Sequence, residues 1–166
     1  LSGAVIMGTG YHSSAELTAG QILCRAIASF RGWKYRSRLV NAIGFGGFNR
    51  RFFPYETEKD WLTTDRKKRD EYIDDPYCGF IFTVNGYYHM FSGMKTLEKK
   101  EIAGKIEKKL PIFFVSGADD PVGGFGKGVK KVYKRYKDAG IADVELRLYR
   151  DDRHEILNET DRAQVY

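Results

Sequence analysis

The sequence predicts an α/β fold whose parallel sheet is interrupted by one large helical insertion. The runs GAVIMGTG (3–10), LPIFFVSG (110–117) and DVELRLY (143–149) are short and apolar, as the buried strands of a parallel sheet are. A helical pattern separates the second run from the third, and the order strand, helix, strand is typical of a right-handed βαβ unit. No convincing strand occurs between 11 and about 105, which predicts the insertion.

This pattern divides the 166 residues into two parts. We expect residues 1–10 and 106–166 to form a core sheet segment and residues 11–105 to form an α-helical cap. The first strand should be covered on both faces, because its apolar run is continuous. A helix is expected over 126–140, ending at Gly140. Its buried face should consist of four residues at helical spacing, namely Val129, Val132, Tyr133 and Tyr136.

The insertion should begin with a helix over 13–32. Ser13 and Glu16 have the spacing of a capping box, and Gly32 is a typical helix end. The apolar face of this helix should consist of Leu23, Ala26, Ile27 and Phe30.

The rest of the insertion is predicted as helices and one irregular connection. A second, basic helix is expected over 33–43, followed by the glycine- and aromatic-rich connection 44–60. Two further helical pieces are expected over 60–76 and 78–97, separated at Asp75 and Pro76.

Charge and cysteine content exclude several classes of protein. The net charge is +6, and the basic clusters are mostly diluted by nearby acidic residues, so a solvated surface is favoured over a nucleic-acid footprint. Such clusters could attract phosphate or an anionic membrane surface. Cys24 and Cys78 lack metal-binding spacing, so we expect two reduced, packed thiols, a cytoplasmic protein, and neither metal nor cofactor. No run of 18 apolar residues exists, so no membrane span is expected.

Candidate catalytic residues follow the last two predicted strands. Asp119 and Asp120 come directly after one strand in SGADDPVG, and His154 follows the next in RHEILNE. The carboxyl ends of parallel strands meet at one edge of a sheet, so Asp120 and His154 should lie close together. An aspartate that holds a histidine in one tautomer is what a hydrolytic triad needs.

These motifs closely resemble the C-terminal half of the α/β-hydrolase fold. The resemblance is to the branch of lysophospholipases, monoacylglycerol lipases and serine aminopeptidase-like hydrolases. GAVIMGTG, FGGFNRRF, DWLTTD and DPYCGFIFT are similar to the segments that form the sixth strand and the cap in these enzymes. The resemblance implies that Asp120 is the acid of a catalytic triad, that His154 is its base, and that Asp119 is a solvated neighbour.

The resemblance also implies a nucleophilic serine in a G-x-S-x-G turn. Glycines do not flank any serine of the chain in this way; the serines are Ser2, Ser13, Ser14, Ser29, Ser37, Ser92 and Ser116. In the family this turn precedes the strand that GAVIMGTG matches, so we expect the nucleophile and the oxyanion hole upstream of this chain. The chain alone should then be inactive and poorly stable. Ser13 and Ser14 follow a strand end, but a capping box accounts for them better.

An aromatic-rich cap suits a lipid substrate. The segment 31–105 is rich in large aromatic side chains, among them Trp33, Tyr35, Phe45, Phe48, Phe52, Phe53, Trp61, Tyr72, Tyr77, Phe80, Phe82, Tyr87, Tyr88 and Phe91. Most should form the core of the cap, and some should line a pocket for an acyl chain. We expect a small lipid-ester substrate such as a monoacylglycerol or a lysophospholipid, a transient contact with a membrane surface, and no nucleic acid. The oligomeric state stays open.

Three alternatives fit the same sequence. A serine aminopeptidase would need an acidic group in the cap to receive the substrate ammonium, and Asp65, Asp74 and Asp75 are available. A non-catalytic binding module would keep the fold without the nucleophile. A basic nucleic-acid binder would show steep salt dependence. Of the two other histidines, His12 could have a minor pocket role, and His89 should be a packed or surface residue.

Overall fold

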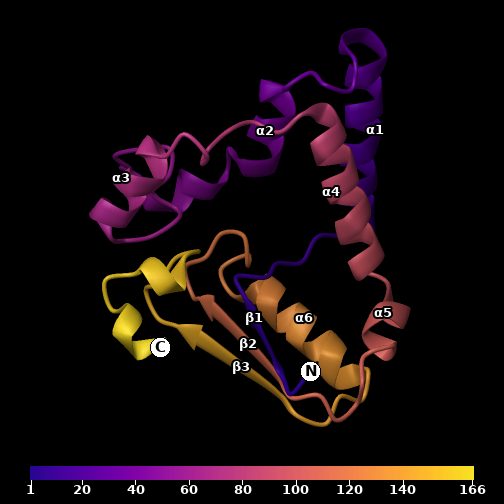
Figure 1. Cartoon of the computed structure of the whole chain (residues 1–166), viewed down its shortest axis with the longest axis vertical. Helices are drawn as coiled ribbons and strands as arrows, with labels where there is room; N and C mark the ends of the chain where they lie inside the picture. The colour runs from indigo at the N-terminus through magenta and orange to yellow at the C-terminus, as the bar shows by residue number, and fades with distance from the viewer.

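The sheet is parallel, as predicted. The computed structural model describes residues 1–166, with every side chain except that of Lys100. The strands β1 (Ala4–Met7), β2 (Ile112–Gly117) and β3 (Val144–Tyr149) pair in the order β1-β2-β3. Both pairs are parallel and in register from the first residue of each strand. The carboxyl ends of all three strands therefore lie at one edge of the sheet (Figure 1).

Helix α6 (Lys127–Asp138) covers one face of this sheet (Figure 1). Its buried Val129 and Val132 pack against Phe114 and neighbouring strand residues. Tyr133 and Tyr136 are partly buried against the same cluster, which confirms the predicted apolar face. Burial of a side chain such as Phe114, which is fully inaccessible, stabilises the fold by roughly 1.5–3 kcal/mol.

The first strand is covered on one face and not on both. Side chains alternate along a strand, so Ile6 points toward the α6 side while Val5 and Met7 point to the other. Ile6 packs against the core cluster, whereas Val5 and Met7 are exposed. The prediction of a strand covered on both faces was therefore wrong for this chain.

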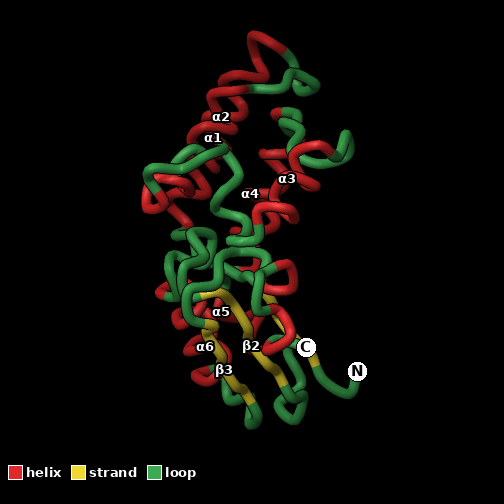
Figure 2. Tube along the Cα trace, turned by 90° about the vertical axis from the view of Figure 1, so that its left-hand side faces the viewer, coloured by secondary structure: helices red, strands yellow, loops and turns green.

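The segment between β1 and β2 is helical, and Figure 2 shows most of it beyond the end of the sheet. We call it the insertion. Its longest helices, α1 (Ser14–Arg31) and α4 (Val84–Leu97), pack side by side (Figure 1). A separate core forms there around Cys24, Val84 and Tyr87. The insertion thus has apolar packing of its own, apart from the cluster between the sheet and α6.

The start of α1 is as predicted, and its buried face is predicted in part, because Leu23 and Ile27 pack against the core of the insertion whereas Ala26 and Phe30 are exposed. Ser13 and Glu16 form the capping box. Leu17, Cys24 and Ala28 are buried, because positions separated by four and seven residues share one side of a helix. Phe30 is 88% exposed, so the predicted face was rotated from the true one.

The other helices of the insertion begin later than predicted. Helix α2 (Arg38–Phe45) starts after Ser37, because the preceding residues run extended beside the segment that leads into α4. Helix α3 (Arg66–Asp74) starts after Asp65, and α4 starts after Thr83. In each case a Ser, Asp or Thr side chain accepts a hydrogen bond from a backbone N–H of the first turn, which fixes the start.

Short elements complete the chain. Helix α5 (Lys100–Gly104) precedes β2. Three 3₁₀ helices cover Phe48–Phe52, Ile156–Asn158 and Arg162–Gln164, the first within the connection that was predicted to be irregular. Of the helices described, none is both long and apolar enough to cross a membrane.

Candidate active site

Asp120 and His154 meet at the carboxyl edge of the sheet, where the sequence placed them. Asp120 lies in the loop after β2 and His154 in the loop after β3. The Nδ1 atom of His154 is 3.0 Å from Oδ2 of Asp120. The Asp120 side chain is fully buried, while that of His154 is 28% exposed. A buried carboxylate therefore supports an imidazole that solvent can reach.

The Asp120 carboxylate is held by its own loop. Its Oδ1 accepts a hydrogen bond of 2.8 Å from the backbone N–H of Val122. The hydroxyl of Ser116, which is also buried, lies 3.3 Å from Oδ2. The backbone N–H of Phe125 closes the turn by donating to the carbonyl of Asp120. These contacts leave Oδ2 directed at His154.

Backbone contacts hold the two loops together. The N–H of Ala118 donates to the carbonyl of Tyr149 at 2.7 Å, and the N–H of Asp119 donates to that of Asp152 at 2.9 Å. Gly117 makes this approach possible. A β-carbon there would lie 2.1 Å from the carbonyl oxygen of Arg153, which is far inside contact distance.

The imidazole of His154 lies between two supports. Gly8, at the end of β1, has φ +60°, and a β-carbon there would lie 3.1 Å from Cε1 of His154. The indole of Trp61 packs beside the imidazole, with 5.3 Å between the ring centroids. In the part of the chain that the structure describes, no hydrogen bond involves Nε2 of His154. An imidazole whose Nδ1–H points at a carboxylate presents Nε2 as a general base.

The other candidate residues are placed elsewhere. Asp119 forms an ion pair with Arg51 at 3.6 Å and is partly exposed. His12 is half-buried and His89 is exposed, and neither is joined to Asp120 or His154 by any hydrogen bond between described side chains. Ser13 is occupied by the capping box.

Sequence-based prediction did not foresee the positions of three residues near His154, although Trp61 was among the aromatic residues expected in the cap. Trp61 belongs to the insertion, and its contact with His154, 93 positions later in the sequence, depends on the folded structure. Glu159 is the last residue of RHEILNE and is fully buried. Asp152 is buried with one oxygen unpaired. Burial, together with the nearby carboxylates of Asp161 and Glu159, raises the pKa of Asp152 to about 7.

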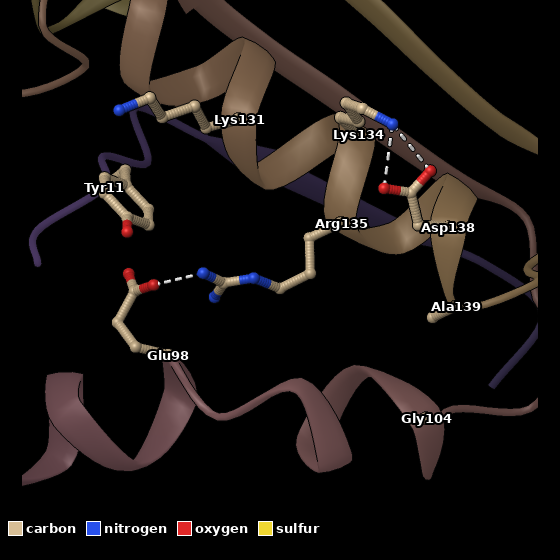
Figure 3. Close-up of a pocket in the computed structure, with 8 residues that line it drawn as sticks. All are labelled: Tyr11, Glu98, Gly104, Lys131, Lys134, Arg135, Asp138 and Ala139. Carbon is tan, nitrogen blue, oxygen red and sulfur yellow. Dashed lines mark hydrogen bonds and ion pairs between the residues drawn. The ribbon is translucent and has the colours of Figure 1, made fainter. Parts of the chain in front are cut away.

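A separate cavity of about 670 Å³ lies between α6 and the segment joining α4 to α5 (Figure 3). Neither Asp120 nor His154 lines it. Its charged groups are largely paired with one another, Arg135 with Glu98 and Lys134 with Asp138. We therefore assign the candidate site from the chemistry of Asp120 and His154 and not from this cavity. Among the described residues, no cluster of His, Cys, Asp and Glu has the arrangement of a metal site.

The sequence matches the family described as serine aminopeptidase, S33, over residues 1–161. The chain belongs to this family of α/β-hydrolases. No curated protein matches the sequence significantly. The predicted partial α/β-hydrolase fold is confirmed by this match and by the solved structures of related fold.

Two solved structures resemble the chain over nearly its whole length. A thermostable carboxyl esterase from Bacillus coagulans, in complex with glycerol, superposes with a TM-score of 0.88 at 24% identity, covering 99% of this chain and 54% of that one. A monoacylglycerol lipase from Paleococcus ferrophilus superposes with a TM-score of 0.65 at 14% identity, covering 99% and 55%. The chain thus spans about half the length of these two proteins.

Proposed function

We propose that the protein is a carboxylic-ester hydrolase that works by Ser-Asp-His acyl transfer, with His154 as the base and Asp120 as the acid of the triad. The observation that carries the proposal is the 3.0 Å contact between His154 Nδ1 and a fully buried Asp120 carboxylate. The placement of both residues after neighbouring parallel strands supports it, as does membership of a serine hydrolase family.

The proposed chemistry has two steps. The serine oxygen attacks the ester carbonyl while His154 Nε2 takes the serine proton. His154 then gives this proton to the leaving alcohol, and an acyl-enzyme remains. In the second step His154 takes a proton from water, the resulting hydroxide attacks the acyl-enzyme, and the proton returns to the serine as the carboxylic acid leaves. Asp120 keeps the imidazole in one orientation and stabilises its positive form.

We propose that the nucleophile is contributed by residues outside these 166. None of the seven serines in the chain has the G-x-S-x-G environment. Ser116, the one that contacts Asp120, is fully buried and bound on the acid's side of the pair. The 166-residue chain alone is accordingly proposed to be inactive.

An uncharged ester is a better substrate for this site than a free amino terminus. An ammonium group needs an accessible, unpaired carboxylate, and two of the candidate carboxylates, Asp65 and Asp119, already have arginine partners. Asp65 binds Arg162 at 3.2 Å and caps α3, and Asp119 binds Arg51. Asp74 and Asp75 are exposed on α3 and directly after it. The aromatic rings of Phe48 and Trp61, which contact each other beside His154, favour an apolar acyl chain.

We therefore propose a monoacylglycerol or a lysophospholipid as the substrate and the insertion as the cap that receives it. The release of an N-terminal residue is the alternative, since the family takes its name from aminopeptidases. We further propose that α2 touches the membrane surface transiently. Leu39 and Ile43 are exposed on this helix beside Arg38, which combines apolar and cationic groups.

Labelling with a fluorophosphonate, which modifies only an activated serine, tests the proposal. The intact mass of a chain extended upstream of residue 1 should rise by one adduct, and that of the 166-residue chain should not change. Asp120→Asn should lower kcat/KM for long-chain esters by on the order of 10⁴-fold. Glu155→Gln, a matched loss of charge beside His154, should change it little. Faster cleavage of an aminoacyl anilide than of any ester would instead establish the peptidase.

Binding to the membrane surface needs its own test. The double variant Leu39→Ser, Ile43→Ser should lose co-sedimentation with vesicles that contain anionic lipid. Leu97→Ser, which removes an equally exposed apolar side chain at the far end of α4, is the control. Equal loss in the control would refute a role specific to α2.

A further inference from the structure

Glu159 has the environment of a residue that holds two distant segments together. Its carboxylate is fully buried, yet no ion pair neutralises it among the described side chains. Burying a carboxylate is costly unless hydrogen bonds replace its water. Four donors do so here. Only one of these donors, the backbone N–H of Arg153, belongs to the loop that carries Glu159. The other three come from the insertion, about 95 positions earlier in the sequence.

The two carboxylate oxygens of Glu159 face different segments. Oε1 accepts a 2.8 Å hydrogen bond from the backbone N–H of Arg153, the residue before His154. Oε2 accepts one of 2.8 Å from the backbone N–H of Thr64, and it also binds the hydroxyls of Thr63 and Thr64. One side chain therefore bridges the histidine loop and the segment Asp60–Asp65 of the insertion.

Other contacts join the same two segments. The N–H of Glu155 donates to the carbonyl of Leu62 at 2.7 Å, and that of His154 reaches the carbonyl of Trp61 at 3.4 Å. The guanidinium of Arg153 donates to the carbonyl of Asp60. As a result, Trp61 is held with its ring against the imidazole of His154. Figure 1 shows the C-terminal segment lying below the α3 region of the insertion.

We infer that Glu159 is a positioning residue: it clasps the histidine loop to the segment Asp60–Asp65, so that Trp61 confines the His154 imidazole to the orientation that faces Asp120. The inference rests on the proposed function only in treating His154 as the catalytic base. It makes the insertion more than a cover over the substrate, because the insertion supplies one wall of the histidine's own pocket. His154 is correctly placed only while Asp60–Asp65 is docked.

The Trp61–His154 contact can be measured without any catalytic activity. A protonated imidazole quenches the fluorescence of an indole that it touches. The chain has two tryptophans, so Trp33→Phe leaves Trp61 as the only indole reporter. In this background, Trp61 emission should be lower at an acidic pH, where imidazoles are protonated, than at an alkaline pH. Adding His154→Ala should abolish this decrease, which would show that His154 causes the quenching.

Two changes loosen the clasp by different means. Glu159→Gln has nearly the same shape, but its amide group turns an N–H donor toward either Arg153 or Thr64, whose N–H groups need acceptors. We expect the amplitude of quenching to fall at least twofold. Thr64→Val removes one hydroxyl donor without altering the carboxylate and should lower the amplitude less. Thr64→Ser restores the hydroxyl and should restore the amplitude.

Glu155→Gln is the matched control, since it removes the same charge from the same loop without touching the clasp. It should leave the quenching unchanged. Full quenching in both Glu159→Gln and Thr64→Val would overturn the inference, as would equal losses in Glu155→Gln and Glu159→Gln. Far-UV circular dichroism establishes that each variant is folded. If Glu159→Gln does not fold, Thr64→Val still tests the inference.

In the extended chain, Glu159→Gln should lower kcat with little change in KM. If Glu159→Gln and Thr64→Val lose quenching but neither the 166-residue chain nor the extended chain hydrolyses any ester, the proposed function is refuted while the positioning role of Glu159 stands.

Discussion

Replacing Gly117 by alanine should force apart the loops that carry Asp120 and His154. A β-carbon at this position would lie 2.1 Å from the carbonyl oxygen of Arg153 and 2.2 Å from that of Asp152, whereas ordinary contact begins at 3.4 Å. Both obstacles are backbone atoms, so no side chain can turn away to make room. The loops have to separate by roughly 1 Å, which is enough to break hydrogen bonds between them.

The expected cost follows from the bonds at risk. Two backbone hydrogen bonds, from Ala118 to Tyr149 and from Asp119 to Asp152, contribute about 1 kcal/mol each. The contact between His154 and Asp120 would also lengthen. We expect Gly117→Ala to lower the free energy of unfolding by about 3 kcal/mol. In a chain extended upstream of residue 1, it should also reduce the proposed esterase activity by more than the loss of folded protein explains.

Urea denaturation followed by circular dichroism measures this effect, and Gly93→Ala is the matched control. Gly93 lies within α4, and nothing is within 4 Å of a β-carbon there, so alanine should stabilise the protein by roughly 0.5–1 kcal/mol. The two substitutions add the same atom and should have opposite signs. A Gly117→Ala protein that unfolds within about 0.5 kcal/mol of the wild type would refute the proposed steric separation of the loops.

Three further predictions concern titration and thiol chemistry. Because the pKa of Asp152 is raised to about 7 in the folded state, the protonated form favours folding, and stability should fall as pH rises from about 4 to 7. Asp152→Asn should remove this part of the pH dependence and be more stable than the wild type above about pH 7; an unchanged profile would show that Asp152 is ionised. Cys24 is fully buried, and burial raises the pKa of its thiol, so a disulfide reagent should modify only Cys78 in the native protein, and Cys78→Ser should abolish the native reaction. Rapid native labelling of that variant would contradict the packing around α1.

Features set by local sequence were predictable, and features set by distant contacts were not. The strands and α6 were found because apolar periodicity reports burial directly, and the meeting of Asp120 with His154 followed from the parallel order of β2 and β3. The capping box at Ser13 was equally local. The start of α3 was misplaced because Asp60–Asp65 is held by the histidine loop and not by helical bonds.

The exposed Phe30 shows the same limit within one helix. A hydrophobic face chosen from spacing alone has several solutions on α1, and the partner helix α4 selects the one that contains Leu17, Cys24 and Ala28. The role of Glu159 and the contact of Trp61 with His154 were not predicted for this reason too. The motif RHEILNE gives no sign that the Glu159 carboxylate accepts hydrogen bonds from residues about 95 positions earlier in the sequence.

The two members of the candidate pair therefore depend on different parts of the chain. Asp120 is fixed by residues within five positions of it, through Ser116, Val122 and Phe125. His154 is fixed largely by the insertion, through Trp61 and the clasp at Glu159. Changes in the insertion that reshape a substrate pocket should consequently leave the acid in place and displace the base. Under the proposed function, alteration of the insertion around Asp60–Asp65 would thus affect the placement of the base as well as the shape of the substrate pocket.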